Sequence, residues 1–401
     1  MDDENAHDSE ENAQLSLLDL PNEMFLQICT FLDASTLVHG LNLACKYTYD
    51  ILNDDNLLWK ARLDRILPNE KSWKLSCVAI KEQRALWKQP DSMEKLEFPD
   101  GYSAISVLLM SVDGIPYLVA TKPCKVFYTK LSYPDVSFDD VEVFDVRSPH
   151  RLRRDCSLTA IDNTAYSCCT DNTVKSLLTN TDGLVYSKTY EIKCDKTDGL
   201  RCMSSCPEQA RFAIGSADGT IYVYDSRSSS NKPISQYRPN NAVVTNLAMN
   251  AEYILSASLD GTVSIWDQRT EQIKKSITIP GNPVPWCISM QWNLVCIGDD
   301  KAKLHMLNLN NDIELVNSYS IRDTNISSDA NIITGVYLTR GCLITSSYDG
   351  TVRISSPTDP PRSIATLAHR SREINSMDYL NDTLAIAGES LVVWRPRNRR
   401  V

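Results

Sequence analysis

Residues that usually carry catalysis or bind metals do not stand at useful spacings in this sequence. It contains no H-E-x-x-H, no G-x-S-x-G and no phosphate-binding glycine run. The adjacent carboxylates of Asp299 and Asp300 could supply an acid and a base, but they stand at a predicted turn, where we expect both to be solvated. The sequence therefore predicts a protein with no catalytic residues, cofactor or metal, whose function depends on what it binds. The five histidines are scattered at His7, His39, His150, His305 and His369.

The cysteines and the net charge indicate the cellular compartment and exclude some classes of binding partner. The 13 cysteines have no metal-like pairing, and Cys202 and Cys206 stand one residue too far apart for C-x-x-C. An odd number of cysteines without an apolar N-terminal stretch indicates reduced thiols, so we expect a cytoplasmic or nuclear protein. The net charge of −10 argues against general binding to nucleic acid or acidic membranes. No apolar run approaches the ~18–20 residues that span a membrane.

Three stretches of the chain, 215–225, 257–267 and 346–356, repeat one pattern: a short strand, an Asp-Gly-Thr turn and a second strand. The turn aspartates Asp218 and Asp260 are 42 residues apart, and Asp349 follows 89 residues later, about two more repeats. A period of roughly 40–45 residues is typical of a β-propeller, whose blades bury their faces against one another. Propellers bind partners far more often than they catalyse reactions.

The propeller is predicted to span residues 93–398 and to have seven blades. Segment 93–98 is well placed to supply the outer strand of the last blade, which would close the ring and remove an exposed edge. Segment 132–150 is expected to be a long loop between blades. Besides the three clear repeats, which supply blades 3, 4 and 6, the predicted blade segments are 105–110 with 117–131, 157–178, 284–309 and 374–395.

The N-terminal part has a helical pattern. Residues 1–14 carry six acids and no Lys or Arg and are expected to be a disordered tail. Residues 15–63 contain three short predicted helices, the first starting at Pro21 with apolar residues recurring at helical spacing. Residues 64–92 form a predicted helical linker, with one helix over 71–89. So small a helical module is marginal alone and usually leans on a partner.

These motifs carry a resemblance to a known family. The helical module resembles an F-box and the repeats resemble WD repeats, so the chain looks like a member of the F-box/WD-repeat family over about residues 15–398. Only one repeat ends in Trp-Asp, at Trp266-Asp267, and the Gly-His pair that opens a WD repeat is absent. We therefore expect the buried Asp–His–Trp networks of the family to be mostly incomplete. The F-box pattern is carried by Leu20-Pro21-x-Glu23-Met24-x3-Ile28-x2-Phe31-Leu32, with Leu37, Cys45 and Leu58-Trp59 after it.

The resemblance implies a substrate-recognition subunit of a Skp–cullin–F-box ubiquitin ligase. In that family the F-box docks on the Skp adaptor, which leads to the cullin and RING subunits, and the propeller holds a protein substrate. An alternative for the F-box stripe is that Met24, Ile28 and Leu32 face the module's own core. The residues that match the adaptor-binding pattern are Leu20, Pro21, Met24, Ile28, Leu32, Leu37, Leu58 and Trp59.

Propellers of this family usually bind a peptide where the innermost strands begin, around the mouth of the central channel. Relatives that read phosphorylated peptides place several arginines there, whereas this sequence offers one arginine and one lysine on different blades. We therefore expect an apolar or aromatic-lined groove for an unidentified substrate. Trp286 could instead pack inside its blade, and Arg201 could be an ordinary solvated charge. The candidate substrate-binding residues are Arg201, Thr245, Leu259, Trp286, Thr334, Tyr348 and Asn375.

The sequence is compatible with two functions from different classes. The first is the ligase receptor, which has no active site and holds a substrate near the ubiquitin-charged enzyme. The second is a WD-repeat scaffold that does not act in ubiquitination. The basic run 395–400 could be a nuclear signal, a contact for an acidic partner or a solubilising tail.

Overall fold

The structure is a computed structural model that divides into two units, residues 1–81 and 82–401, which are described separately. The predicted acidic tail, 1–14, lies outside the described residues, as does most of segment 132–150. The structure describes residues 17, 20–32, 34–54, 58–59, 73–99, 102–122, 125–131, 142–145, 156–180, 183–193, 199–309, 313–321, 332–358, 360–369 and 373–397.

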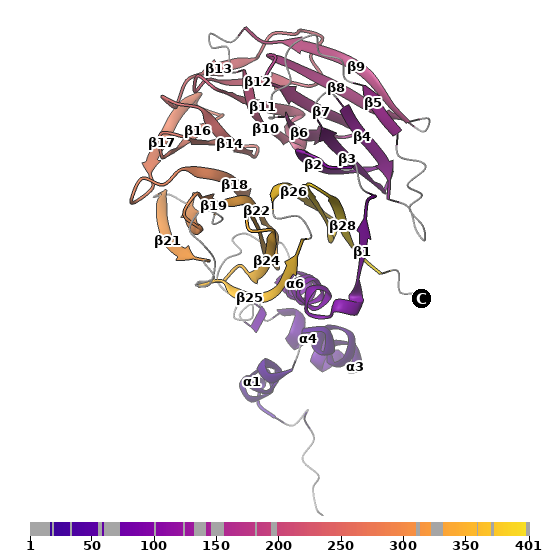
Figure 1. Cartoon of the computed structure of the whole chain (residues 1–401). Coiled ribbons are helices and arrows are strands. Elements are labelled where there is room, and N and C mark those ends of the chain that lie inside the picture. The colour runs from indigo at the N-terminus through magenta and orange to yellow at the C-terminus, as the bar shows by residue number, and fades with distance from the viewer. Residues whose placement is uncertain are drawn as a thin grey trace, which may run out of the picture. The chain divides into compact units, whose positions relative to one another are not determined.

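The first unit is a small helical module (Figure 1). Helix α1 starts directly after Pro21, as predicted, because proline favours the first turn of a helix, where its missing N–H leaves no bond unmade. A π-helical turn, η2, joins two short α-helical pieces into one helical stretch over 34–44, and the N-terminal half of α6 also belongs to this unit. The bounds are α1 Asn22–Phe31, α2 Ala34–Thr36, η2 Leu37–Leu41, α3 Asn42–Ala44, α4 Lys46–Asp54 and α6 Trp73–Lys88.

The core of the helical module forms around Trp59. Its indole Nε1 donates a hydrogen bond to the Leu52 carbonyl at 2.8 Å, so the ring is buried with its polar atom satisfied. Phe25 and Cys29, four residues apart on one face of α1, pack into the same core. The remaining buried members are Ala34, Leu37, Leu52, Leu58, Cys77, Val78 and Ile80.

The second unit is the predicted seven-bladed propeller, with seven four-stranded antiparallel sheets around a central channel (Figure 1). Short 3-10 turns, η3 (Pro90–Ser92) and η5 (Pro207–Gln209), lie before β1 and inside blade 3. Blades 1–3 contain β2 Ser106–Val112, β3 Ile115–Lys122, β4 Lys125–Lys130, β5 Glu142–Asp145; β6 Cys156–Ile161, β7 Thr164–Cys169, β8 Thr173–Asn180, β9 Gly183–Glu191; and β10 Leu200–Cys206, β11 Arg211–Ser216, β12 Ile221–Asp225, β13 Ser235–Tyr237. Blades 4 and 5 contain β14 Val244–Met249, β15 Tyr253–Ser258, β16 Thr262–Asp267, β17 Gln272–Thr278; and β18 Pro285–Gln291, β19 Leu294–Asp299, β20 Lys303–Asn308, β21 Glu314–Ser320. Blades 6 and 7 contain β22 Ile333–Leu338, β23 Leu343–Ser347, β24 Thr351–Ser356, β25 Arg362–Ala368; and β26 Ile374–Leu380, β27 Thr383–Gly388, β28 Leu391–Pro396 with β1 Met93–Glu97.

The ring closes as predicted. Strand β1 is the outer strand of blade 7 and pairs antiparallel with β28, with Leu96 opposite Val393. Segment 132–150 was expected to be a loop throughout, and this is wrong for residues 142–145. They form β5, the outer strand of blade 1, whose Phe144 lies opposite Val126. With only four residues, β5 is too short for its pattern to stand out within this long polar segment.

Hydrogen bonds that the turn aspartates accept fix the repeated turns. Asp260 accepts from the backbone N–H of Thr262 at 3.0 Å, and Asp349 accepts from that of Thr351 at 2.8 Å. Burial opposes ionisation of both carboxyls. Nevertheless the hydrogen bonds that they accept, with Arg353 beside Asp349, hold the pKa of each below its usual range. The turn aspartates are therefore ionised and structural.

The buried networks depart from the WD pattern in a different way in each blade. In blade 4, Asn240 stands at the loop before the first strand, with its amide bonding Thr262 at 3.2 Å and Ser256 at 2.7 Å. In blade 6, Arg353 Nη2 donates to Asp349 Oδ2 at 2.9 Å. The expectation of incomplete Asp–His–Trp networks holds in these blades, where other polar side chains satisfy the buried groups.

Blade 5 contains a buried Asp–His–Ser network, which corrects the prediction that Asp299 is solvated. Asp299 is fully buried and accepts from the backbone N–H of Lys301 at 2.8 Å and of Lys303 at 2.7 Å. Its second oxygen lies 2.9 Å from His305 Nε2, and His305 Nδ1 lies 2.7 Å from Ser318 Oγ. Asp299 therefore does the work of the turn aspartate in this blade, where the Asp-Gly-Thr turn is missing.

The C-terminal half of α6 is anchored within the propeller unit by one fully bonded glutamine. Gln83 Nε2 donates to Tyr379 Oη at 2.8 Å and to Asp382 Oδ1 at 2.9 Å. Its Oε1 accepts from Thr339 Oγ1 at 2.8 Å and from the Gly341 backbone N–H at 2.9 Å. All four bonds reach the first hairpins of blades 6 and 7. The predicted helix over 71–89 is thus present as α6.

Candidate protein-binding surfaces

Helix α1 is apolar on two faces. Phe25 and Cys29 fill the core of the module, whereas Met24, Ile28 and Phe31, spaced by four and three residues, form a second stripe that is exposed. Phe31 is 85% exposed. Exposed apolar side chains that lie next to one another usually mark a surface that binds another protein. We call Met24, Ile28 and Phe31 the α1 stripe. Of the remaining predicted docking residues, Pro21 is exposed and Leu20 and Leu32 are half-buried.

The predicted docking set needs a correction. Leu37, Leu58 and Trp59 are buried in the core of the module, so they have no surface to offer a second protein. Their contribution is to support the exposed residues from behind. Sequence reasoning omitted Phe31 from the set although it continues the Met24–Ile28 spacing, and it also missed Leu43, which is strongly exposed. No signal separates Leu43 from a core residue in so short a helical piece.

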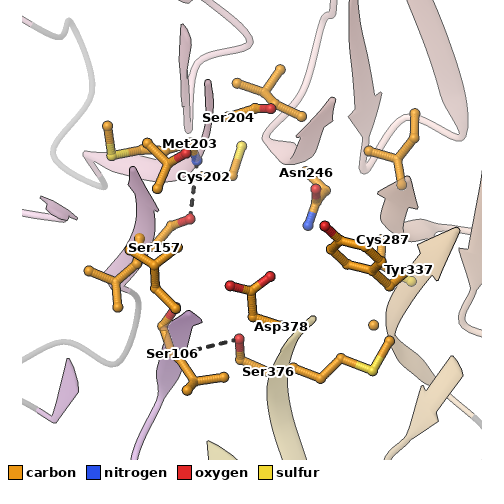
Figure 2. A pocket seen from close by; sticks show the side chains of 18 of the residues that line it. Ser106, Ser157, Cys202, Met203, Ser204, Asn246, Cys287, Tyr337, Ser376 and Asp378 are labelled. Carbon is orange, nitrogen blue, oxygen red and sulfur yellow. Dashed lines mark hydrogen bonds between the residues drawn. The ribbon is translucent and has the colours of Figure 1, made fainter. Parts of the chain in front are cut away.

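The innermost strands of all seven blades surround a cavity of about 880 Å³, the central channel (Figure 2). Six of the seven predicted substrate-binding residues line this one cavity, although they come from five blades. The exception is Tyr348, which is half-buried outside the lining. The six are Arg201, Thr245, Leu259, Trp286, Thr334 and Asn375.

A common backbone feature explains why five of these six residues, all except Leu259, face the cavity. In blades 3 to 7 the pairing of the first two strands shifts by one residue near the start of the innermost strand, which is a β-bulge. A bulged residue leaves the ladder and its side chain is re-aimed. The residue skipped by the pairing in each blade is Arg201, Thr245, Trp286, Thr334 or Asn375.

Three of the bulged residues already use their polar atoms within the propeller. Thr245 Oγ1 donates to the Pro285 carbonyl, and Asn375 Nδ2 donates to the Ala104 carbonyl at 3.3 Å. Thr334 Oγ1 lies 3.0 Å from Ser346 Oγ. These three side chains join neighbouring strands or blades, and they are less available to a ligand than their position suggests.

Polar side chains deeper in the channel join adjacent blades. Ser157 Oγ accepts from the Met203 backbone N–H at 3.1 Å, and Ser376 Oγ accepts from that of Val107 at 3.4 Å (Figure 2). Asp378 Oδ2 accepts from the Leu109 N–H at 2.7 Å, so the closing blades, 7 and 1, share a charged bond. The sequence analysis did not predict a role for these residues, although polar residues alternate along β6 and β26.

Asp378 is the unusual group in the channel, and its carboxylate points into the cavity (Figure 2). Burial raises the pKa of Asp378 to about 6, although the N–H groups of Leu109 and Tyr379 that bond it work in the opposite direction. A pKa raised above that of the unfolded chain means that the folded state holds this proton more tightly. Stability should therefore fall as pH rises from about 4 through about 6.

We expect Asp378→Asn to stabilise the propeller at pH 7.5 and to do so much less at pH 5. The neutral amide oxygen can still accept from the Leu109 N–H, while the cost of a buried charge disappears. That cost is at most about 3 kcal/mol for a pKa raised by about two units. Melting temperatures at the two pH values measure the effect, with Asp162→Asn, the same change at an exposed hairpin, as the control. An equal gain at both pH values would contradict the assignment.

The described residues do not gather into a metal site, and most of their cysteines are buried. Within this part of the chain, no group of three or more His, Cys, Asp or Glu side chains could hold a metal ion. Burial raises the pKa of the Cys168, Cys296 and Cys342 thiols to about 12, so these thiols stay protonated and unreactive. None of the described helices is both long and apolar enough to cross a membrane.

Comparison with known protein families agrees with this arrangement of domains. An F-box-like family model matches residues 17–65, and the WD domain, G-beta repeat, matches residues 187–225 and 231–267. The chain thus combines an F-box-like region with WD repeats, in that order. The matched F-box-like region contains the α1 stripe, and the matched repeats lie in blades 2 to 4.

Named relatives combine the same two parts. The chain is 28% identical over 397 residues to F-box/WD repeat-containing protein 9 of Homo sapiens, which covers 94% of this chain and 82% of the relative. The Bos taurus protein of the same name is 27% identical over the same length and with the same coverage. Among solved structures, U3-55K is similar with a TM-score of 0.61 at 12% identity, covering 77% of this chain and 99% of that one. This last likeness concerns the propeller fold alone.

Proposed function

We propose that this F-box/WD-repeat chain is the substrate receptor of a Skp–cullin–F-box ubiquitin ligase. The helical module docks on the Skp adaptor, through which the chain reaches the cullin and RING subunits, and the propeller holds a protein substrate. The chain supplies no reacting group. It raises the concentration of the substrate near the ubiquitin-charged enzyme, which is how tethering accelerates a bimolecular step.

The α1 stripe is the observation that carries this proposal. Met24, Ile28 and Phe31 are exposed on a small module whose core is already filled by other residues of the same helix, such as Phe25. Each large apolar side chain that a partner buries contributes about 1.5–3 kcal/mol. The F-box-like match over 17–65 favours the Skp adaptor as that partner.

Binding of the purified full chain to purified Skp adaptor tests the proposal. We expect Ile28→Asp to weaken binding about 100-fold or more, because a carboxylate would be buried in place of an apolar contact. Thr30→Asp is the matched control: it adds the same charge to an exposed position of α1 away from the stripe and should leave the affinity nearly unchanged. Isothermal titration calorimetry measures all three proteins.

Two results would contradict the proposal. One is a wild-type chain that does not bind the adaptor, which would favour a scaffold outside ubiquitination. The other is an equal loss of binding in Ile28→Asp and Thr30→Asp, which would show that the adaptor does not bind specifically to the α1 stripe. Circular dichroism of each variant verifies that the helical module remains folded.

A further inference from the structure

Two large apolar side chains at the mouth of the channel are left partly exposed by the rest of the protein. Leu259 is 41% exposed and Trp286 is 40% exposed, and both line the cavity. Both have a fixed backbone: the Leu259 N–H donates to the Val243 carbonyl at 2.9 Å, and Trp286 stands at a bulge between the buried residues Pro285 and Cys287. Trp286 is thus held out of its blade and aimed at the mouth, and it does not fill the blade core.

These two residues form an arc with Arg201. The three come from blades 3, 4 and 5, whose innermost strands β10, β14 and β18 lie next to one another in the ring. The neighbouring bulged residues Thr245 and Thr334 use their hydroxyls within the protein. A ligand at this arc therefore meets an aromatic ring, an aliphatic side chain and a guanidinium.

Charge on the cavity wall limits the ligand further. Among the described lining residues, Arg201 is the only Lys or Arg, whereas a phosphate is usually held by several such groups. The lining carboxylates are Asp162 and Asp378, and Asp378 on blade 7 points into the channel (Figure 2). A ligand carboxylate would therefore be favoured beside Arg201 and repelled deeper in the channel.

From this geometry we infer that the propeller binds an unphosphorylated linear peptide. One bulky apolar side chain of that peptide packs between Leu259 and Trp286, and an acidic residue near it pairs with Arg201. The inference rests on the proposed function, since it names the class of substrate segment that the receptor would hold. Trp286 is the specificity-determining residue, because aromatic side chains at the centre of a contact dominate binding energies.

Selection of a phage-displayed library of random dodecapeptides on the immobilised full chain tests this inference. We expect enriched peptides to share a Trp, Phe, Leu or Met with an Asp or Glu within a few positions. Fluorescence polarisation with a synthetic copy of an enriched peptide should show about 30-fold weaker binding to Trp286→Ala, the loss typical of a hot spot. Trp286→Phe should retain most of the affinity, and Leu259→Ala should lose part of it.

Controls separate this site from general stickiness. Ile273→Ala removes an equally exposed apolar side chain from an outer strand, β17, and should change nothing. Arg201→Gln should remove the preference for an acidic residue while the apolar preference stays. A synthetic phosphoserine version of the peptide that bound more tightly would overturn the inference, as would no enriched peptide at all or full binding by Trp286→Ala.

Failure here is distinguishable from failure of the ligase proposal. Adaptor binding measured on the same preparations reports on the α1 stripe alone. Adaptor binding without peptide binding would overturn the peptide inference and leave the receptor proposal standing. Peptide binding without adaptor binding would do the opposite.

Discussion

His305→Ala is expected to lower the free energy of unfolding of the propeller by about 3 kcal/mol, because it leaves the Asp299 carboxylate buried without its partner. A carboxylate only accepts hydrogen bonds, so His305 Nε2 carries the hydrogen across the 2.9 Å contact, while Nδ1 lies 2.7 Å from Ser318 Oγ. The substitution removes both bonds and opens a cavity in blade 5. Thermal unfolding should shift down by roughly 6 °C for a domain of this size.

A double-mutant cycle identifies the cause of this loss. Asp299→Asn keeps an oxygen that can accept from the Lys301 and Lys303 N–H groups but removes the buried charge. In the double variant, His305→Ala should therefore cost at least about 1 kcal/mol less than it does alone. Additive losses would show that His305 acts through packing only. His39→Ala, at an exposed histidine, controls for the change of residue type.

Gly219→Ala is expected to destabilise the propeller by more than about 4 kcal/mol, which few single substitutions do. Gly219 has a φ of +90°, and a Cβ placed there would lie 2.2 Å from the Asn240 carbonyl oxygen and 2.9 Å from that of Ala242. Both oxygens belong to the backbone that leads into blade 4, so relief requires one blade to move against the next. Denaturant unfolding measures the change.

Gly281→Ala is the matched control for this effect. Gly281 has nearly the same φ, +84°, but nothing lies within 4 Å of an added Cβ. It should cost only the backbone strain of an alanine in the left-handed region, about 1–2 kcal/mol. Equal losses in the two variants would show that strain alone matters and that the contact between the blades can relax.

The fold was largely predictable because its signal is periodic. Asp-Gly-Thr turns fix hairpin register locally, and their spacing gives the blade count, so even the pairing of β1 with β28 follows from the need to close the ring. The bulges at Arg201 or Trp286 have no such signal. A bulge depends on how two strands match along their whole length, and that is decided by packing between blades.

The positions of the candidate binding residues were easier to predict from the sequence than the burial and partners of their side chains. Six of the seven candidate substrate residues line one cavity, because aligning the blades on their turns finds the same level in each. In helix α1, Phe25 and Ile28 are both apolar at helical spacing, and periodicity alone does not distinguish the one that faces the core. Asp299 was misjudged because its partner His305 is brought near by strand pairing.

The pairing of β1 with β28 has a consequence during synthesis on the ribosome. Leu96 cannot pair until Val393, about 300 residues later, has been synthesised. Synthesis of that stretch takes roughly 15–60 s at ordinary translation rates. Throughout that interval β1 is an unpaired strand, and six blades can stack while the ring stays open. A message truncated before Leu391 would release a chain whose ring never closes, with edges that chaperones or proteases recognise. The propeller ring therefore closes only in chains that have been synthesised through their last strand, β28.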